Sequence, residues 1–264
     1  MMLDDIESKI RTVHVTRYIM PFKEGGSLPG LAEADDCFEY VLKFKGAGQG
    51  TRALIADFLG GEIARLLGLR IPELVFAVID EAFGQSEPDE EIQDLLKASR
   101  GLNLGVHFLA KSITFDAVAT YVSPQLAAKI VWLDGYLMNV DRTVKNTNML
   151  VWNKELWLID HGASLYFHHN MDNWKDAVAS PFTGIQKHVL LYHAKNVTAI
   201  DAWAKKILTP DKLKELVELI PEEWLIEEDG TFSVAEKRNI YFEFLTQRLQ
   251  QSEHFVKTIA AYEK

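Results

Sequence analysis

The sequence predicts an α+β protein with two lobes, a small β-rich lobe containing one helix and then a mostly helical lobe. Short runs rich in β-branched and aromatic residues dominate the first 110 residues. Longer runs with apolar residues at helical spacing dominate the remainder, and a small hairpin interrupts them. We expect residues 1–112 to form the first lobe and residues 113–264 the second, within one domain overall.

The first lobe begins with strands separated by a glycine-rich turn. Residues 12–20 alternate loosely, and residues 24–30 contain three glycines. Residues 38–45 predict a second strand, with Lys43 on the opposite face from Leu42. The turn therefore precedes a strand that carries a lysine.

The rest of the first lobe combines one long helix with two further strands. Apolar residues recur at helical spacing over 52–67, and Gly68 ends that helix. Residues 74–79 predict a short apolar strand, residues 90–98 a surface helix and residues 102–110 another strand.

The second lobe has clear helix starts. Ser123 and Pro124 begin a helix that we expect to run to about Asn139, with serine as the cap. Residues 150–152 and 156–159 predict a hairpin. A helix begins at Thr209 and Pro210, and a capping box at Ser233 opens a helix to about Tyr262.

Composition excludes several classes of protein. The chain has 28 Lys and Arg against 38 Asp and Glu, a net charge of −10, and no basic run, so we expect no nucleic-acid partner. Cys37 is the only cysteine, which excludes an internal disulfide and a cysteine-based zinc site. Residues 1–9 carry three acidic residues and no apolar core, so we expect no signal peptide. The sequence has no run of about 18 apolar residues, so we expect a cytoplasmic protein without a membrane span.

The stretch from Asp141 to Gly162 carries the main chemical signal. Asp141 and Asn146 lie five positions apart in a polar loop, and Asp160 ends an apolar strand as part of an Asp-x-Gly sequence. Phosphoryl transfer needs one carboxylate to orient the attacking hydroxyl, and an amide oxygen with a second carboxylate to hold magnesium. Read separately, each of these residues is equally typical of a turn. Their order around a hairpin favours the phosphoryl-transfer interpretation.

The first half of the chain supplies the other parts of a nucleotide site. Lys43 is the strand lysine that could reach nucleotide phosphates, and Glu62 in the following helix could pair with it. The backbone amides of the turn containing Gly25, Gly26 and Ser27 could cover the phosphates.

These segments together resemble the HipA-like kinases, a family within the protein-kinase-like and phosphatidylinositol-kinase-like superfamily. The resemblance runs from about residue 12 to residue 195, and it is carried by the sequences GGSLPG (25–30), YVLKFKGAGQG (40–50), NVDR (139–142) with Asn146, and WLIDHG (157–162). It looks closest to a compact branch of short bacterial proteins. It implies a two-lobed protein-kinase-like fold, use of ATP and Mg²⁺, and transfer of phosphate to a hydroxyl.

The resemblance also implies roles for single residues. Lys43 matches the lysine that contacts the phosphates, and Asp141 matches the catalytic aspartate. Asn146 and Asp160 match the metal ligands, while Glu62 matches the partner of the lysine. In toxin-type relatives a loop serine is autophosphorylated, which makes Ser27 a candidate for the same modification.

The sequence departs from the pattern of ordinary protein kinases in its catalytic loop. No His-Arg pair precedes Asp141, and Arg142 follows it instead, as in the lipid-kinase and HipA-like pattern. The chain is also shorter than the toxin-type proteins, so their biological role does not carry over. By family analogy we expect the acceptor to be a serine or threonine of an unidentified protein.

Other functions stay open at this point. The acceptor could be a small molecule or a lipid, and the chain could be a nucleotide-binding pseudokinase that acts as an interaction module. A metal hydrolase is the third alternative, because five histidines lie between His161 and His193, with Asp160 and Asp172 nearby in the sequence.

Overall fold

The computed structural model describes residues 10–22, 28–48, 50–81, 83–84, 88–226 and 230–263. The chain divides into two compact units, the first comprising residues 1–54 and 72–110 and the second residues 55–71 and 111–264. Helix α1 (Gly50–Leu66) begins in the first unit and continues in the second. Residues 55–71 group with the second unit, whereas the sequence placed them in the first lobe. One reason is that the backbone N–H of Leu158 donates to the carbonyl of Arg70.

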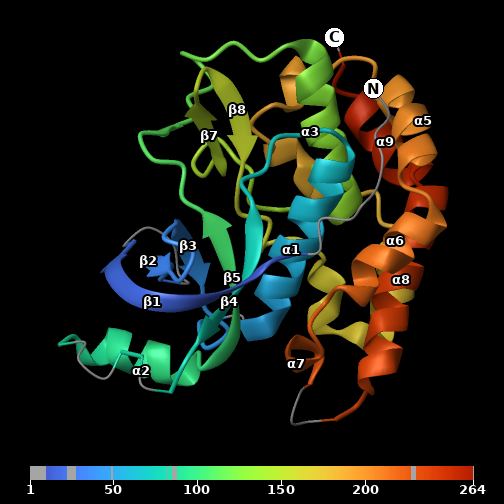
Figure 1. The fold of residues 1–264 in the computed structure, drawn as a ribbon. Helices are drawn as coiled ribbons and strands as arrows, with labels where there is room; N and C mark the ends of the chain where they lie inside the picture. Colours follow the sequence, from blue (N-terminus) through green and yellow to red (C-terminus); the bar gives the residue numbers. More distant parts are fainter. Residues whose placement is uncertain are drawn as a thin grey trace. The chain divides into compact units, whose positions relative to one another are not determined.

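Five strands of the first unit form a closed barrel in the order β1-β2-β3-β5-β4 (Figure 1). Neighbouring strands are antiparallel except for β1 and β4, which pair in parallel and close the barrel. The strands are β1 (Thr12–Pro21), β2 (Gly30–Ala34), β3 (Glu39–Lys43), β4 (Leu74–Ile79) and β5 (Gly101–His107).

The barrel interior explains the alternation in the sequence. Leu42 in β3 and Phe44 just after it are 1% and 3% exposed, whereas Val41 and Lys43 are half-buried on the other face. Helix α2 (Glu90–Ala98) adds Leu96 to the apolar core of the barrel. The core residues are Val13, Val15, Ala32, Ala34, Tyr40, Leu42, Phe44, Val75, Ala77, Ile79 and Leu96.

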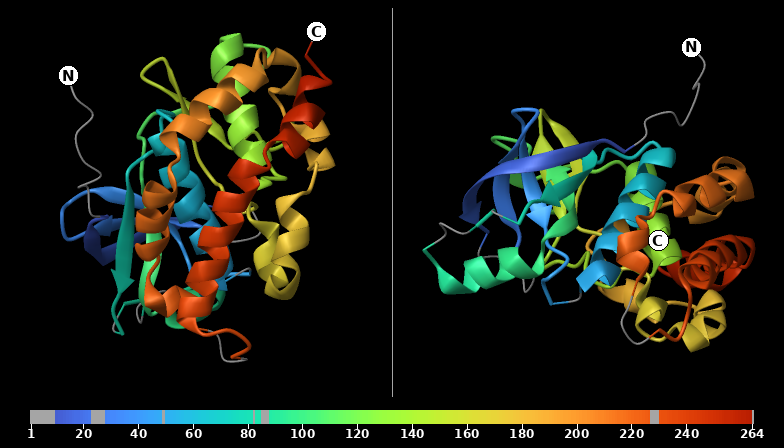
Figure 2. Two further views of the ribbon diagram at one scale, coloured as in Figure 1. Left: turned by 90° about the vertical axis from the view of Figure 1, so that its right-hand side faces the viewer. Right: turned by 60° about the horizontal axis from the view of Figure 1, so that its bottom comes forward.

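Helices make up most of the second unit (Figure 2). Helix α3 is buried on nearly all sides and contacts α5 and α9, which is why its sequence is apolar around its circumference. The helices of this unit after α1 are α3 (Pro124–Leu137), α4 (Trp174–Val178), α5 (Val197–Ile207), α6 (Pro210–Glu218), α7 (Glu222–Leu225), α8 (Val234–Gln250) and α9 (Glu253–Ala260). Short 3₁₀ turns cover Tyr166–His169, Met171–Asn173, Thr183–Lys187 and Leu191–His193.

A three-stranded sheet in the second unit contains the predicted hairpin. Its order is β6 (Ile113–Thr114), β7 (Met149–Trp152) and β8 (Glu155–Leu158). The turn residues Asn153 and Lys154 have φ of 49° and 65°. Positive φ at both central residues is the geometry of the two-residue turns that match the twist of a hairpin.

A buried arginine joins three segments of the second unit. Arg248 in α8 is 0% exposed and donates to the carbonyls of Gly135 and Tyr136 in α3. It also donates to the carbonyls of Ala177, Val178 and Ser180 around the end of α4, and it lies 4.9 Å from the ring centre of Phe255. These carbonyls satisfy its donors, and burial lowers the pKa of Arg248 to about 10.

The structure differs from the sequence prediction at several elements. The single helix expected over residues 233–262 is wrong, because it breaks at Gln251 and Ser252 into α8 and α9. Strand β2 follows the predicted glycine-rich turn and was not predicted, nor were β6 and α4. The remaining predicted strands and helices are confirmed with boundaries shifted by three residues or fewer.

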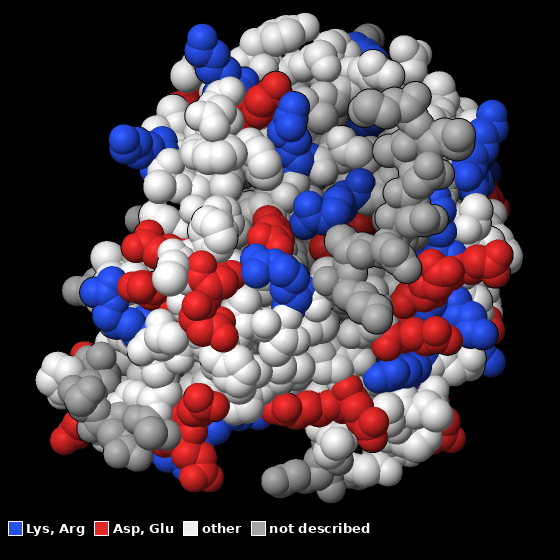
Figure 3. Space-filling view, viewed as in Figure 1, with Lys and Arg blue, Asp and Glu red and all other residues white. Residues whose placement is uncertain are grey.

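One face of the molecule carries charges of both signs. Acidic and basic side chains are interspersed on the face shown in Figure 3. No helix within the described residues is long and apolar enough to cross a membrane.

Candidate active site

The predicted catalytic loop follows directly from the end of helix α3. Met138 caps the helix in the left-handed conformation, with φ of 60°, and its backbone N–H donates to the carbonyl of Asp134. The N–H of Asn139 donates to the same carbonyl at 2.9 Å. This cap turns the chain sharply, so the residues after α3 form a loop that is anchored at its first residue.

Asp141 is held by hydrogen bonds on both its side chain and its backbone. Its Oδ2 accepts from Nδ2 of Asn146 at 2.6 Å and from Nδ2 of Asn148 at 3.3 Å. Its backbone N–H donates to Oδ1 of Asn139 at 3.0 Å. Both side-chain donors are neutral amides, so they orient the carboxylate without neutralising its charge.

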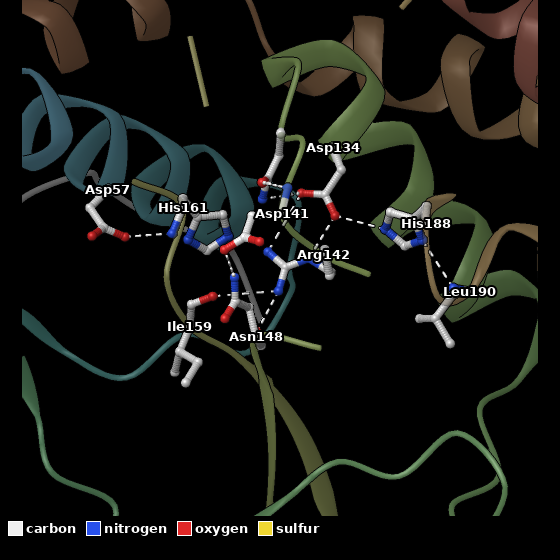
Figure 4. A network of polar contacts seen from close by, with 10 residues as sticks. Asp57, Asp134, Asp141, Arg142, Asn148, Ile159, His161, His188 and Leu190 are labelled. Atoms are coloured by element: carbon white, nitrogen blue, oxygen red, sulfur yellow. Dashed lines mark hydrogen bonds and ion pairs between the residues drawn. The ribbon is translucent and has the colours of Figure 1, made fainter. Parts of the chain in front are cut away.

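A buried ion pair lies behind this loop (Figure 4). Arg142 Nε donates to Oδ2 of Asp134 at 2.6 Å, and both side chains are 0% exposed. Nη1 of Arg142 donates to the carbonyls of Asn148 and Ile159. Burial by itself raises the pKa of Asp134, but Arg142 and His188 outweigh it and hold that pKa well below its ordinary value.

Asp160 lies at the end of β8 in a conformation that few residues adopt. Its φ is 54°, in the left-handed region, and its Oδ1 accepts from the N–H of Gly162 at 3.4 Å. The preceding residue, Ile159, donates its N–H to the carbonyl of Asn148 at 3.0 Å. Asp160 is therefore connected to the loop of Asp141 through the backbone of its neighbour.

Helix α1 supports the residue after Asp160. Oδ1 of the buried Asp57 accepts from the N–H of His161 at 2.5 Å. A Cβ added at Gly60 would lie 2.6 Å from Cβ of His161, closer than two carbons can approach. Only glycine lets the helix and this segment lie so close together.

The structure brings together some of the predicted site residues. Asp141 and Asn146 are in direct contact, and Asp160 is joined to their loop through Ile159 and Arg142. Gly25, Gly26 and Ser27 lie outside the described residues. The catalytic and metal-binding roles assigned to these residues stay predictions.

The two residues predicted to act as an ion pair lie in different units. Lys43 is in β3 of the first unit, opposite Leu104 of β5. Glu62 is in the part of α1 that belongs to the second unit, where it accepts from Nε of Arg65 at 3.2 Å. Burial raises the pKa of Glu62, and Arg65 partly offsets that effect. The pairing of Lys43 with Glu62 stays a prediction.

Sequence reasoning missed the residues that support the loop. Asp134 interrupts an otherwise apolar helix, and that interruption is the one local signal of a buried functional charge. Arg142 was noted only as a departure from the protein-kinase pattern. Asn148, His188 and Asp57 have no distinctive spacing from Asp141, so their contacts could not be predicted.

The donor atoms suit a hard divalent cation. Because Asn146 directs its Nδ2 at Asp141, its Oδ1 could serve as an oxygen ligand, and Asp160 could supply carboxylate oxygens. Mg²⁺ prefers a small number of such ligands together with water and phosphate oxygens. Across the described ranges, no three His, Cys, Asp or Glu side chains gather as a metal site of the kind that the hydrolase alternative requires.

Several solved structures of kinases are similar to this chain. The proinflammatory kinase CtkA of Helicobacter pylori matches 96% of this chain over 98% of its own length, with 11% identity and a TM-score of 0.55. Two structures of the Golgi casein kinase, one with Mn and ADP bound, match 94% and 96% of this chain over 73% and 72% of theirs, with 12% identity and TM-scores of 0.45.

The likeness to CtkA shows a kinase-like fold and confirms the predicted two-lobed α+β class. No curated protein sequence matches the chain. The sequence model of the HipA-like kinases matches residues 15–259. Since this match spans nearly the whole sequence, the chain belongs to the HipA-like kinase family.

Proposed function

We propose that this protein is an ATP- and Mg²⁺-dependent kinase that transfers the γ-phosphate to a serine or threonine hydroxyl of another protein. The observation that carries the proposal is the contact of 2.6 Å between Asn146 and Asp141, in a loop tied to the backbone before Asp160. The sequence resemblance to the HipA-like kinases assigns these three side chains to the catalytic and metal-binding positions.

Asp141 is the proposed acceptor of the hydroxyl proton. Its carboxylate is half-buried and is oriented by two amide donors, so one of its oxygens can receive a hydrogen bond from an incoming hydroxyl. Holding that hydroxyl in line with the phosphorus removes much of the entropic cost of the reaction.

Asn146 and Asp160 are the proposed metal ligands. Bound Mg²⁺ supplies charge neutralisation on the phosphate oxygens. The task of this chain's residues is to hold oxygen donors in fixed positions. Asn146 is held by its hydrogen bond to Asp141, and Asp160 by the hydrogen bonds of its two neighbours, Ile159 and His161.

The proposal assigns the nucleotide phosphates to Lys43 and to the turn containing Gly25, Gly26 and Ser27. Glu62 is the proposed partner of Lys43, and Ser27 is a candidate for autophosphorylation. These assignments are supported by the order of the residues in the sequence and by the family resemblance, and the choice of a protein acceptor by the family resemblance alone. The proposed cytoplasmic location is supported by the sequence alone.

Incubation with labelled ATP and Mg²⁺ tests the proposal. Wild-type protein should transfer label to itself or to proteins of a bacterial lysate. Asp141→Asn and Asp160→Asn should each reduce the initial rate by about a hundredfold or more. Asp172→Asn is the matched control, because it removes an exposed carboxylate from the same unit.

The outcomes separate the alternatives. Magnesium-dependent ATP binding without transfer by the wild type would establish the pseudokinase instead. Transfer to a lipid extract or to small-molecule alcohols, with no labelled protein, would replace the protein acceptor. Equal rates for Asp141→Asn and Asp172→Asn would remove Asp141 from the mechanism.

A further inference from the structure

We propose that Asp134 and His188 form a positioning pair that fixes the chain segment 188–190 beside the catalytic loop and so determines how the acceptor is placed. The effect on acceptor placement rests on the proposed kinase function. The contacts of Asp134 and His188 do not depend on that function. Neither residue is a proposed ligand of the metal or the nucleotide.

Asp134 connects three parts of the second unit through one buried carboxylate. Its Oδ1 accepts from Nδ2 of Asn139 at 3.0 Å, at the start of the catalytic loop. Its Oδ2 accepts from Nε of Arg142 at 2.6 Å and from Nε2 of His188 at 2.8 Å. In the sequence, Asn139 and Arg142 flank Asp141, whereas His188 belongs to the segment that follows Asp160. Figure 4 shows the contacts of Asp134 with Arg142 and His188.

The hydrogen bonds of His188 determine its tautomer. Its Nδ1 is the acceptor for the backbone N–H of Leu190 at 3.0 Å, so Nδ1 carries no proton. The ring proton is therefore on Nε2, which donates to Asp134. A neutral imidazole also leaves one positive and one negative charge in this buried cluster, that of Arg142 and that of Asp134.

Backbone contacts place the same segment directly against the catalytic loop. Thr143 and His188 form an antiparallel bridge, and the N–H of Val189 donates to the carbonyl of Arg142 at 3.1 Å. Thr143 is two residues after Asp141. Residues 188–190 are themselves buried, whereas Gln186 and Lys187 just before them are exposed. The position of the buried segment therefore sets where its exposed neighbours lie beside the loop that an acceptor hydroxyl must reach.

Two consequences follow from this arrangement. Asn139 and Arg142 hold the loop of Asp141 from one side of Asp134, and their loss should lower kcat. His188 holds the bordering segment from the other side, and its loss should raise the KM for the acceptor while the KM for ATP stays nearly constant.

Three substitutions of His188 separate its two hydrogen bonds. In His188→Gln, the amide nitrogen can replace Nε2 and keep the bond to Asp134. In His188→Asn, the amide oxygen can replace Nδ1 and keep the bond to Leu190, but the side chain is too short to reach Asp134. His188→Ala removes both bonds, and His193→Ala is the control for an exposed histidine nearby.

Kinetics with a purified acceptor peptide provide the first readout. We expect His188→Gln to stay within about twofold of wild type, and His188→Asn and His188→Ala to raise the acceptor KM about tenfold with kcat and ATP KM within about threefold. Wild-type behaviour of His188→Asn, or failure of His188→Gln to rescue, would overturn the proposal.

Hydrogen exchange provides a readout that does not depend on activity. The amide of Val189 should exchange about tenfold faster in His188→Asn and His188→Ala than in wild type, and at the wild-type rate in His188→Gln and His193→Ala. Unchanged exchange in all variants would refute the positioning pair even in an active kinase. If the wild-type protein transfers no phosphate, the proposed function fails, and the exchange pattern alone tests the positioning pair.

If His188→Ala does not fold, the comparison of His188→Asn with His188→Gln tests the positioning pair.

Discussion

Asp160 shows how single residues are held in an unfavourable conformation at this site. A positive φ is uncommon for a residue other than glycine, although aspartate and asparagine adopt it more readily than most. The hydrogen bonds of Ile159 to Asn148 and of His161 to Asp57 fix the backbone on both sides. The surrounding fold therefore maintains the orientation of the carboxylate that we propose as a metal ligand.

Glu62 should make the stability of the free protein depend on pH. Because burial raises its pKa above the ordinary value of 4.5, the folded protein holds this proton more tightly than the unfolded chain. Its contribution to stability is complete below that ordinary value and is lost as the pH rises through the raised pKa. Glu62→Gln removes this dependence, so its free energy of unfolding should rise relative to that of wild type as the pH increases above 4.5.

Urea unfolding at a series of pH values measures this effect. Glu215→Gln, which changes an exposed carboxylate of α6, should follow the wild-type pH dependence. Parallel curves for wild type and Glu62→Gln would contradict the expected burial effect. If Glu62 also positions Lys43 in catalysis, the stabilised Glu62→Gln protein should transfer phosphate more slowly.

Residues with a fixed spacing along the chain could be predicted, whereas supporting residues could not. Asp141 and Asn146 are five positions apart and were both predicted to belong to the site, and the structure places them in contact at 2.6 Å. His188 reaches Asp134 across 54 positions, and His161 reaches Asp57 across 104. No local pattern of polarity encodes such distant pairs, because each is created by the packing of separate elements.

Helices and strands could be predicted where a regular spacing of apolar residues was bounded by a capping or turn residue. Helix α3 has a serine cap and proline at its start, and the hairpin of β7 and β8 has a polar two-residue turn. The break between α8 and α9 has neither glycine nor proline, so the helical pattern continues through Gln251 and Ser252. Residues 166–193 fold mainly as 3₁₀ turns, which leave no sustained period in the sequence.

Helix α1 should be unable to accept a side chain at position 60. Gly60→Ala gains helix propensity of about 1 kcal/mol, but its Cβ would lie 2.6 Å from Cβ of His161. Displacing that segment should cost about 1–3 kcal/mol of overpacking and should also disturb Asp160. We expect a lower thermal midpoint together with a lower rate of phosphate transfer.

Gly135→Ala is the matched control for this prediction. Its Cβ would lie 2.9 Å from Cδ2 of Phe255, so it also crowds a helix contact, but one with α9. Gly135→Ala should also lower the thermal midpoint. The folded fraction of this variant should transfer phosphate at a rate closer to wild type than that of Gly60→Ala. If both variants lose the same amount of phosphate-transfer rate for the same drop in thermal midpoint, Gly60 has no specific link to Asp160.

At the scale of the whole molecule, ligand binding should stabilise the folded chain. If ATP with Mg²⁺ binds only the folded state, a ligand concentration a hundred times its Kd adds about 2.7 kcal/mol. For a chain of 264 residues this should raise the thermal midpoint by about 5–10 °C. Thermal unfolding with ATP plus Mg²⁺, ATP plus EDTA, and Mg²⁺ alone measures the shift.

Asp160→Asn tests whether the shift uses the proposed ligand. This variant should unfold at nearly the wild-type midpoint without ligand and should lose most of the magnesium-dependent part of the increase. A full increase in Asp160→Asn would place the cation elsewhere. The absence of any increase in wild type would argue against nucleotide binding under these conditions.

The carbonyl contacts of Arg248 have a consequence for synthesis on the ribosome. The carbonyl of Ser180 precedes its guanidinium donor by 68 positions, and that of Gly135 precedes it by 113. While the nascent chain emerges, both stretches are made long before the group that joins them. The second unit can therefore reach its native packing only after α8 has left the ribosome, and until then these carbonyls lack the donor that satisfies them in the folded protein.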